Sequence, residues 1–400
     1  MNPWRGVRGL PREVWALAAT TFVNRVGTMV IPFLVLYLTG PLGFSSALAG
    51  AIVGVFGATS IVAAPVSGRL ADRFGATRVM GSSLVLSAAV LALYPFVRGV
   101  APVIAATVLF AAVSEAYRPA SLSAVSLAAG AEQRKAAFAL NRLAINLGMS
   151  VGPALGGFLA AWSYTALFWV DGASSLAAAA VLAWAPVRAA AREPAEPRAA
   201  TADDPSRAPL LGEAWRDHRL LYFLFAALPA LIVFFQLTAS LPLFLVRDLG
   251  YSAAFYGALF TLNTLIIVVL EVPLNVAMAD WPAGRQLALG AALVALGFGG
   301  MALTHGRVGL AVTVVVWTFG EMVLLPAMAA YVGDIAPEHR SGEYMGLFTM
   351  TFGFALVLAP PIGTFLLDRF GGGVLWPAML GLGLASAALL TRVAAPVHSR

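Results

Sequence analysis

The sequence predicts an all-α polytopic membrane protein with twelve transmembrane helices. The chain has 400 residues, of which 60% are hydrophobic and only 11% are charged. Its apolar runs extend for about 20 residues with scarcely a charge, which is the length that crosses a hydrocarbon core of about 30 Å. Strands of a transmembrane barrel would instead alternate polar and apolar residues over about ten positions. The runs lack that alternation, which favours helices.

Twelve such runs follow one another along the chain. They lie near residues 14–38, 46–68, 79–97, 101–126, 137–161, 165–185, 219–246, 253–277, 286–304, 308–332, 343–367 and 373–393. The first is longer than the apolar region of a cleavable signal and has no small-residue cleavage site, so we expect a retained helix. The chain contains no cysteine, which excludes disulfides and thiolate metal ligands.

The basic residues indicate the orientation of these helices. Of the 25 lysines and arginines, 18 fall in the termini and connections on one side, four on the other side and three within the runs. Because cytoplasmic segments carry the excess of Lys and Arg, both termini are predicted to be cytoplasmic. The basic residues then lie at an anionic lipid surface, so we do not expect nucleic acid as a partner.

The connection between the second and third helices has an unusual order of residues. It reads GRLADRFGATRV at 68–79. Gly68 would permit close backbone approach and Gly75 a turn, while Asp72 could face the positive N-terminus of a neighbouring helix. Such a contact could form in one conformation and break in another. We therefore expect a conformational latch here.

The two halves of the chain resemble each other at an offset of 206 to 210 residues. The matching segments are GFSSALAG with GYSAAFYG, IPFLVLYL with LPLFLVRD, PVSGRLAD with PLNVAMAD, and EAYRPASLSAV with EMVLLPAMAAY. Residues 186–218 between them are rich in Pro, Ala and charged residues, which is typical of a linker. We predict a bundle of six helices at 1–185, a cytoplasmic linker at 186–218 and a second bundle of six helices at 219–400.

This arrangement resembles the major facilitator superfamily over essentially the full chain. The loop at 68–79 is similar to that family's consensus between helices 2 and 3, with matches at Gly68, Asp72, Arg73, Gly75 and Arg78 among others. A degenerate second copy keeps Asp280. The resemblance implies two bundles that rock about a central cleft, so that a substrate site opens to each side in turn.

A small-residue stripe in the fifth helix bears on the direction of transport. The stripe, in LGMSVGPALGGFLA, comprises Gly148, Gly152, Pro153, Gly156 and Gly157. Close helix packing alone would explain it. The stripe also resembles a GxxxGPxxGG motif that this superfamily associates with export by proton antiport. Efflux is favoured on that resemblance.

Proton coupling requires an acid that changes its charge during the cycle. Four acids lie within the spans: Glu115, Asp171, Glu271 and Glu321. Glu115 and Glu321 occupy equivalent positions in the repeat, and the resemblance puts their helices beside the central cavity, so we rank them first. Arg118 could instead pair with Glu115 and make it structural. Asp171 lies toward the outer end of its helix and Glu271 close to the inner end of its own, so a structural or gating role is favoured for each, and Asp171 could also reach lipid headgroups.

Several polar side chains are candidates for substrate binding. Arg25 and Asn24 lie in the middle third of the first helix, where Glu115 would be the natural partner of the guanidinium. The remaining candidates, which could instead serve headgroup contacts, helix–helix hydrogen bonds or lipid contacts, are Arg118, Asn141, Arg142, Gln236, Asn263 and Tyr256. Tyr256 could form an apolar wall with Phe234, Phe235 and Phe260.

The function expected from these features is proton-driven export of amphipathic small molecules. The alternative is proton-coupled uptake of a peptide or another polar or anionic solute. A membrane enzyme or receptor has no support, because the sequence holds no phosphate-binding glycine loop, HExxH motif or Cys/His cluster. We expect no cofactor and a proton gradient as the energy source. The protein would be a monomer in the bacterial inner or plasma membrane, with lipids, protons and a small-molecule substrate as partners.

Overall fold

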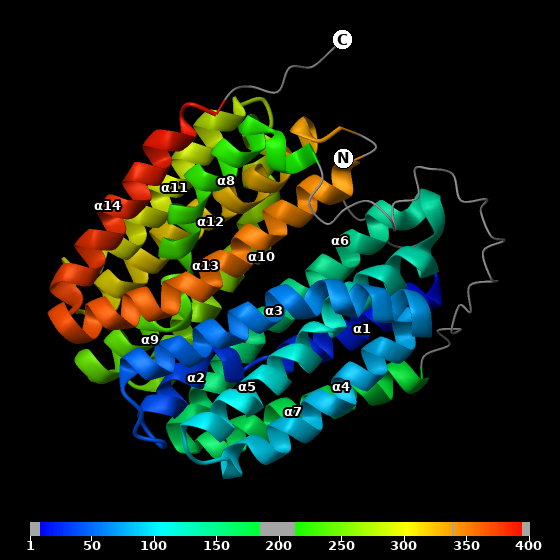
Figure 1. Ribbon diagram of the computed structural model, residues 1–400, viewed down its shortest axis with the longest axis horizontal. Coiled ribbons are helices and arrows are strands. Elements are labelled where there is room, and N and C mark those ends of the chain that lie inside the picture. Colours follow the sequence, from blue (N-terminus) through cyan, green and yellow to red (C-terminus); the bar gives the residue numbers. More distant parts are fainter. Residues whose placement is uncertain (1–8, 185–212, 338–339, 394–400) are drawn as a thin grey trace. The chain divides into compact units, whose positions relative to one another are not determined.

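The computed structural model describes residues 9–184, 213–337 and 340–393, which are helical almost throughout (Figure 1). The chain forms two compact units. Unit 1 comprises Met1–Glu193 and Leu245–Val268, and unit 2 comprises Pro194–Phe244 and Val269–Arg400. Residues 245–268 thus pack with the first half of the sequence. The predicted division into bundles at 1–185 and 219–400 remains a prediction.

Unit 1 contains seven described helices from the first half of the chain and the beginning of an eighth. They are α1 (Arg12–Gly27), α2 (Val30–Thr39), α3 (Ser46–Phe74), α4 (Ala76–Leu93), α5 (Val100–Glu115), α6 (Tyr117–Trp162), α7 (Tyr164–Trp184) and the first part of α10 (Ala253–Ala277), with a short 3-10 turn η1 (Tyr94–Phe96). Apolar residues of α1, α4, α6 and α7 form a buried core that includes Leu17, Met80, Leu84 and Leu182.

Unit 2 is built from the remaining helices. They are α8 (His218–Phe234), α9 (Ser240–Leu243), the rest of α10, α11 (Ala283–Gly300), α12 (Arg307–Ile335), α13 (Ser341–Phe370) and α14 (Gly372–Leu390), with the 3-10 turns η2 (Glu213–Arg216) and η3 (Phe235–Thr238). A π-helical segment, η4 (Phe244–Asp248), follows α9. Aromatic rings fill part of the core: Phe298 stacks on Trp317 with ring centroids 5.4 Å apart.

The predicted spans agree closely with these helices. Eleven helical stretches of the described chain are long and apolar enough to cross a membrane. The predicted run 286–304 forms α11, which is not among the eleven. Its sequence, AGRQLALGAALVALGFGG, begins with a charged and an amide side chain and is rich in glycine, which lowers its hydropathy. The prediction of an all-helical, multi-span membrane protein is confirmed.

Two predicted boundaries differ from the structure. The run 101–126 is interrupted at Ala116, between α5 and α6. Helical residues in α6 then continue through 130–135, where the sequence predicts a loop between two runs. The candidate spans on either side of residues 130–135 are Val100–Ala129 and Ala136–Trp162. Residues 130–135 contain no proline and little glycine, so nothing in their local sequence forces the helical conformation to stop.

The first helix of each half is broken at an equivalent position of the repeat. In unit 1, α1 ends at Gly27 and α2 begins at Val30. In unit 2, Ala239 has φ −137° and ψ −58°, and α9 begins at Ser240, which is 210 residues after Val30. That separation equals the offset between IPFLVLYL and LPLFLVRD. Each break frees backbone groups that need other partners inside a membrane.

Candidate functional site

Arg25 lies in the last turn of α1, and its Nε atom is buried without a hydrogen-bond partner among the described residues. Glu115 and Tyr117 interact favourably with its charge, while Arg118 opposes it. The predicted association of Arg25 with Glu115 therefore has electrostatic support. Arg118 itself is exposed. Because a guanidinium in a span is costly unless it meets a polar partner, Arg25 is the strongest anion-binding candidate in unit 1.

Glu115 stands at the interruption between two helices. It is the last residue of α5, it is half-buried, and α6 begins two residues later at Tyr117. The hydroxyl groups of Tyr117 and Thr21 share a buried hydrogen bond of 3.0 Å, which joins α6 to α1 four residues before Arg25. This pair was not predicted from the sequence. Its signal is a tyrosine that stands between an acid and an arginine within a span.

Asp171 caps the second half of the broken first span. Its Oδ2 atom accepts hydrogen bonds from the backbone amides of Met29, at 3.1 Å, and Val30, at 3.0 Å. The residue is only 5% exposed, so its side chain is buried within unit 1 and does not reach lipid headgroups. The sequence places Asp171 more than 140 residues from its partners, and no local pattern reveals the pairing.

The other polar candidates of unit 1 differ in burial. Asn141 is buried, and its Oδ1 atom has no hydrogen-bond partner among the described residues. Arg142 is exposed. The backbone carbonyl of Asn24 accepts a hydrogen bond from the Thr28 hydroxyl at 3.1 Å, beside the break between α1 and α2. Asn141 is thus buried in the bundle, Asn24 is half-buried, and Arg142 is exposed.

Tyr256 and Asn263 belong to the part of α10 that packs in unit 1. Both are buried, and the Tyr256 ring meets Phe33 edge-on with centroids 5.2 Å apart. The Phe260 ring also contacts Tyr256, at 6.3 Å between centroids. Tyr256 and Phe260 thus pack together with Phe33, and an apolar wall that binds substrate stays a prediction. Phe234 and Phe235, which were predicted to join it, contact each other in unit 2.

Two acids of unit 2 lie on neighbouring turns of packed helices. Asn275 of α10 donates from Nδ2 to the backbone carbonyl of Glu271, at 2.8 Å, and to that of Met322 in α12, at 3.3 Å. Met322 directly follows Glu321, and both acids are half-buried and have interactions of their own. Asn275 therefore places the Glu271 turn beside the Glu321 turn. This bridge was not predicted from the sequence, because Asn275 lies in the degenerate copy of the loop motif.

Gln236 joins the broken span of unit 2 to α13. It is fully buried, and its Nε2 atom donates to the carbonyl of Ala359 in α13 at 3.1 Å. The Ser240 hydroxyl donates to Gln236 Oε1 at 2.6 Å. Gly363 approaches both polar groups so closely that a Cβ atom there would overlap them. These contacts support the helix–helix interpretation of Gln236 rather than a free substrate ligand.

The small-residue stripe of α6 faces two different helices. Gly148 and Gly152 pack against the backbone of α1, and a Cβ atom on Gly152 would lie 2.9 Å from the Val26 carbonyl oxygen. Gly157 packs against α10, where an added Cβ atom would lie 3.1 Å from the Cα atom of Gly257. Close helix packing through small residues is thus observed. Pro153 contributes the carbonyl that approaches Gly257, and Gly156 packs on Met29 and Phe33.

The predicted latch residues lie at the end of α3 and the beginning of α4. Gly75 has φ +92° and joins the two helices, which confirms the predicted turn. An added Cβ atom on Gly68 would meet no described atom within 4 Å, so the predicted close approach is absent. Asp72, Arg73 and Arg78 are exposed. Among the described residues Asp72 has no hydrogen bond or ion pair, and Asp280 of the second copy is also exposed. The latch remains a prediction.

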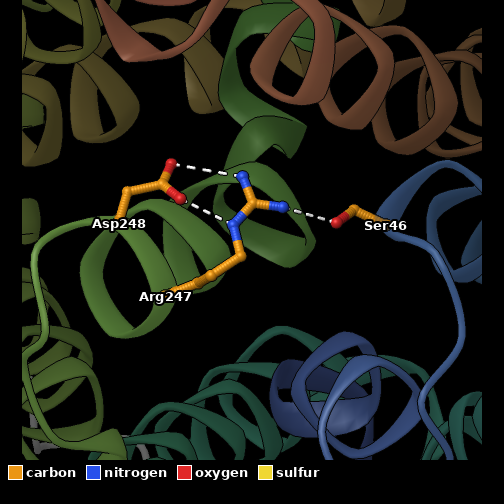
Figure 2. A network of polar contacts seen from close by, with 3 residues as sticks. All are labelled: Ser46, Arg247 and Asp248. Atoms are coloured by element: carbon orange, nitrogen blue, oxygen red, sulfur yellow. Dashed lines mark hydrogen bonds and ion pairs between the residues drawn. The ribbon is translucent and has the colours of Figure 1, made fainter.

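A second arginine network, which was not anticipated, joins the segment after α9 to the start of α3 (Figure 2). Arg247 forms a two-pronged contact with Asp248, through Nε at 2.6 Å and Nη2 at 3.2 Å. Its Nη1 atom donates to the Ser46 hydroxyl. All three residues belong to unit 1. Because the pair is partly exposed, its contribution to stability is modest, and its value is in orienting the arginine.

Eleven apolar spans, two compact helical units and ionisable side chains inside the spans define a multi-pass membrane transporter. Sequence comparison identifies the family. The profile of the Major Facilitator Superfamily matches residues 17–360 and 242–400. The chain therefore belongs to the major facilitator superfamily, whose members are transporters and not enzymes.

Three relatives and one solved structure illustrate the breadth of this similarity. An uncharacterised transporter of this superfamily from Bacillus subtilis, YqjV, is 25% identical over 383 residues, which cover 93% of this chain and 90% of the relative. A Na(+), Li(+), K(+)/H(+) antiporter from Planococcus maritimus is 22% identical, with 86% and 87% covered. The multidrug resistance protein MdtG of Dickeya zeae is 29% identical over 44% of this chain and 45% of its own. A crystal structure of a peptide transporter, POT, in complex with alafosfalin matches with a TM-score of 0.77 at 21% identity, covering 98% and 96% of the two chains.

Proposed function

We propose that this protein is a proton-coupled secondary transporter that exports amphipathic small molecules by alternating access. The observation that carries the proposal is the placement of half-buried acids inside the spans of both units: Glu115 beside Arg25, and Glu321 beside the Glu271 turn. An acid held away from bulk water can exchange a proton when its surroundings change. The packed GPxxGG stripe and the similarity to an antiporter support export.

The proposed function includes an orientation of the protein in the membrane and a division into two bundles. Both termini are cytoplasmic, the bundles comprise residues 1–185 and 219–400, and the loop at 68–79 acts as a latch between conformations. Substrate contacts come from Arg25, Asn24 and Asn141 in the first unit. The sequence asymmetry of basic residues supports this orientation.

Uptake of a peptide or another anionic solute is the second candidate. It is favoured by the Arg25 Nε atom, which has no hydrogen-bond partner in the described part of the chain and could bind a carboxylate. The fold is also like that of a peptide transporter. The two candidates differ in the direction of transport and in the charge of the substrate.

The coupling acid can be tested in proteoliposomes with an imposed pH gradient. Ethidium, a lipophilic cation, probes the first candidate, and the dipeptide alanyl-alanine probes the second. We expect addition of one probe to dissipate the gradient and Glu321→Gln to abolish that response while the probe still binds. Asp334→Asn is the matched control, because Asp334 is an exposed acid at the end of the same helix, α12.

The outcomes separate the candidates. Dissipation with ethidium and lower dye accumulation in expressing cells support export. Dissipation with the dipeptide and its accumulation in cells support uptake. If Glu321→Gln couples as well as Asp334→Asn does, Glu321 is not the proton carrier.

A further inference from the structure

The break between α1 and α2 leaves backbone amides that a membrane cannot satisfy. The amides of Met29 and Val30 lie where the second helix begins, and such first-turn amides have no partner within their own helix. Both donate to one carboxylate oxygen of Asp171, at 3.1 and 3.0 Å. A carboxylate at a helix N-terminus is also favoured by the positive end of the helix dipole. Asp171 therefore acts as a cap supplied by a different helix, α7.

The same part of α7 touches the break from a second position. Gly27, the last residue of α1, lies so close to Ser174 that a Cβ atom on it would overlap the Ser174 hydroxyl. That hydroxyl donates to the carbonyl of Asp171 at 2.7 Å. Asp171 and Ser174 are one turn apart on α7, so they form one surface against which the break is held. We call Asp171 and Ser174 the α7 clamp.

The clamp lies next to the part of α1 that carries the binding candidates. Across the break, the Thr28 amide donates to the Arg25 carbonyl at 3.2 Å, and the Thr28 hydroxyl donates to the Asn24 carbonyl. On its other side, this turn of α1 packs on Gly148, where an added Cβ atom would overlap the Cβ atom of Arg25. The last turn of α1 is therefore held between α6 and the α7 clamp. Movement at Met29 would shift Arg25.

Different contacts surround the equivalent break in unit 2. There Gln236, an uncharged residue of the broken span itself, donates to the Ala359 carbonyl and accepts from the Ser240 hydroxyl. Neither of these two contacts involves a backbone amide of the break. They are therefore no counterpart of the cap that Asp171 forms on the Met29 and Val30 amides.

We propose that Asp171 is a positioning residue for transport: by accepting the Met29 and Val30 amides it fixes the break in the first span and so holds Arg25 in its binding orientation. This role differs from that of a proton carrier. A carrier requires an ionisable group, whereas a positioning cap requires only an oxygen that reaches two amides. Asp171→Asn preserves that oxygen and Asp171→Ala removes it, so the pair distinguishes the two roles.

The chain's lack of cysteine provides a direct readout of the break. A single cysteine at Thr28 reports its exposure through the rate of labelling by a water-soluble maleimide. We expect Asp171→Ala to raise that rate at least about fivefold and Asp171→Asn to leave it within about twofold. A cysteine at Thr59 is the matched control, because Thr59 is half-buried in unit 1 and donates to the carbonyl four residues earlier, as Thr28 does.

Transport supplies the second readout, with ethidium or alanyl-alanine, whichever probe the protein accepts. We expect Asp171→Ala to raise the KM at least about tenfold with a smaller change in kcat, because Arg25 is displaced. Asp171→Asn should keep both within about threefold. The inference rests on the proposed role of Arg25 only for this KM effect. Labelling at Thr28 tests the cap itself and does not depend on the transported substrate.

Three results would overturn the proposal. The first is no increase of labelling at Thr28 in Asp171→Ala. The second is an equal increase at Thr28 and Thr59, which would show general loosening of the unit. The third is loss of transport in Asp171→Asn as complete as in Asp171→Ala, which would return Asp171 to the proton carriers. If Asp171→Ala does not fold, Asp171→Ser replaces it, because the shorter serine side chain cannot reach both amides. The same outcomes then apply to Asp171→Ser.

Discussion

Addition of one methyl group to Gly152 provides a direct test of the packing between α6 and α1. In Gly152→Ala the new Cβ atom would lie 2.9 Å from the Val26 carbonyl oxygen and 3.0 Å from that of Arg25. Ordinary contacts begin at 3.4 Å, so one helix must move by about half an ångström. Both opposing atoms are backbone. No side chain can rotate to relieve the overlap.

The expected magnitude follows from two opposing effects. Overpacking of a tight contact costs about 1–3 kcal/mol. Alanine is more favourable than glycine within a helix by about 0.5–1 kcal/mol, which offsets part of that cost. We therefore expect a net loss of about 1–2 kcal/mol in the free energy of unfolding. The apparent melting temperature in detergent, measured at a fixed heating rate, should fall.

Gly81→Ala is the control for this measurement. Gly81 is also a helical glycine of unit 1, in α4, but an added Cβ atom there meets only Leu182 Cδ2 at 3.9 Å. It should melt at or above the temperature of the unmodified protein. If Gly152→Ala is as stable as Gly81→Ala, the glycine stripe does not mark a tight helix contact, and the reasoning from built Cβ positions is wrong.

Two further predictions concern hydrogen bonds at helix ends. Asp217 accepts from the Arg219 and Leu220 amides at the start of α8 and from the Tyr344 hydroxyl at 2.7 Å. Burial alone would raise the pKa of Asp217, but these hydrogen bonds lower it below its usual range. The cap therefore stabilises the protein above the unfolded-state pKa of about 3.9 and is lost as the pH falls through the lower folded-state value. Asp217→Ala should reduce the free energy of unfolding at pH 7 by about 1 kcal/mol and so lower the melting temperature. The difference in melting temperature from the unmodified protein should shrink in acid. A difference that is constant or grows in acid would contradict the assignment. Tyr117→Phe should cost about 0.5–1.5 kcal/mol through loss of its hydrogen bond to Thr21. A Thr21→Val, Tyr117→Phe double variant should then be less destabilised than the sum of the single variants, and simple additivity would show that the two hydroxyls are not coupled.

Much of the fold could be predicted because lipid imposes strong constraints on sequence. Length and hydropathy located the spans, and the asymmetry of basic residues suggested an orientation. Gly75 was correctly placed at a turn because a glycine between two apolar runs has few other roles. The interruption at Ala116 was not predicted. Ala116 keeps helical dihedral angles, with φ −64° and ψ −26°, so the sequence around it needs no helix-breaking residue and holds no signal for the interruption.

The partners of the candidate residues were harder to predict than their positions. An association of Glu115 with Arg25 could be proposed from the sequence because an ionisable side chain inside a membrane is costly unless it has a partner. The partners of Asp171 could not be predicted, because the groups that donate to its carboxylate are backbone amides, which every residue except proline has. The bridge made by Asn275 had the same difficulty, since both of its acceptors are backbone carbonyls. Side chains that satisfy backbone groups thus leave little trace in a single sequence.

The contact between Gly157 and Gly257 limits how this protein can change. Both residues are already the smallest possible, so a larger residue at one position cannot be accommodated by a smaller residue at the other. A second substitution therefore cannot compensate for the first at this helix crossing. The Phe33 and Tyr256 pair differs, because a smaller side chain at one position could make room for a larger one at the other. Both glycines are therefore constrained by packing, whereas the sizes of the two aromatic side chains can change together.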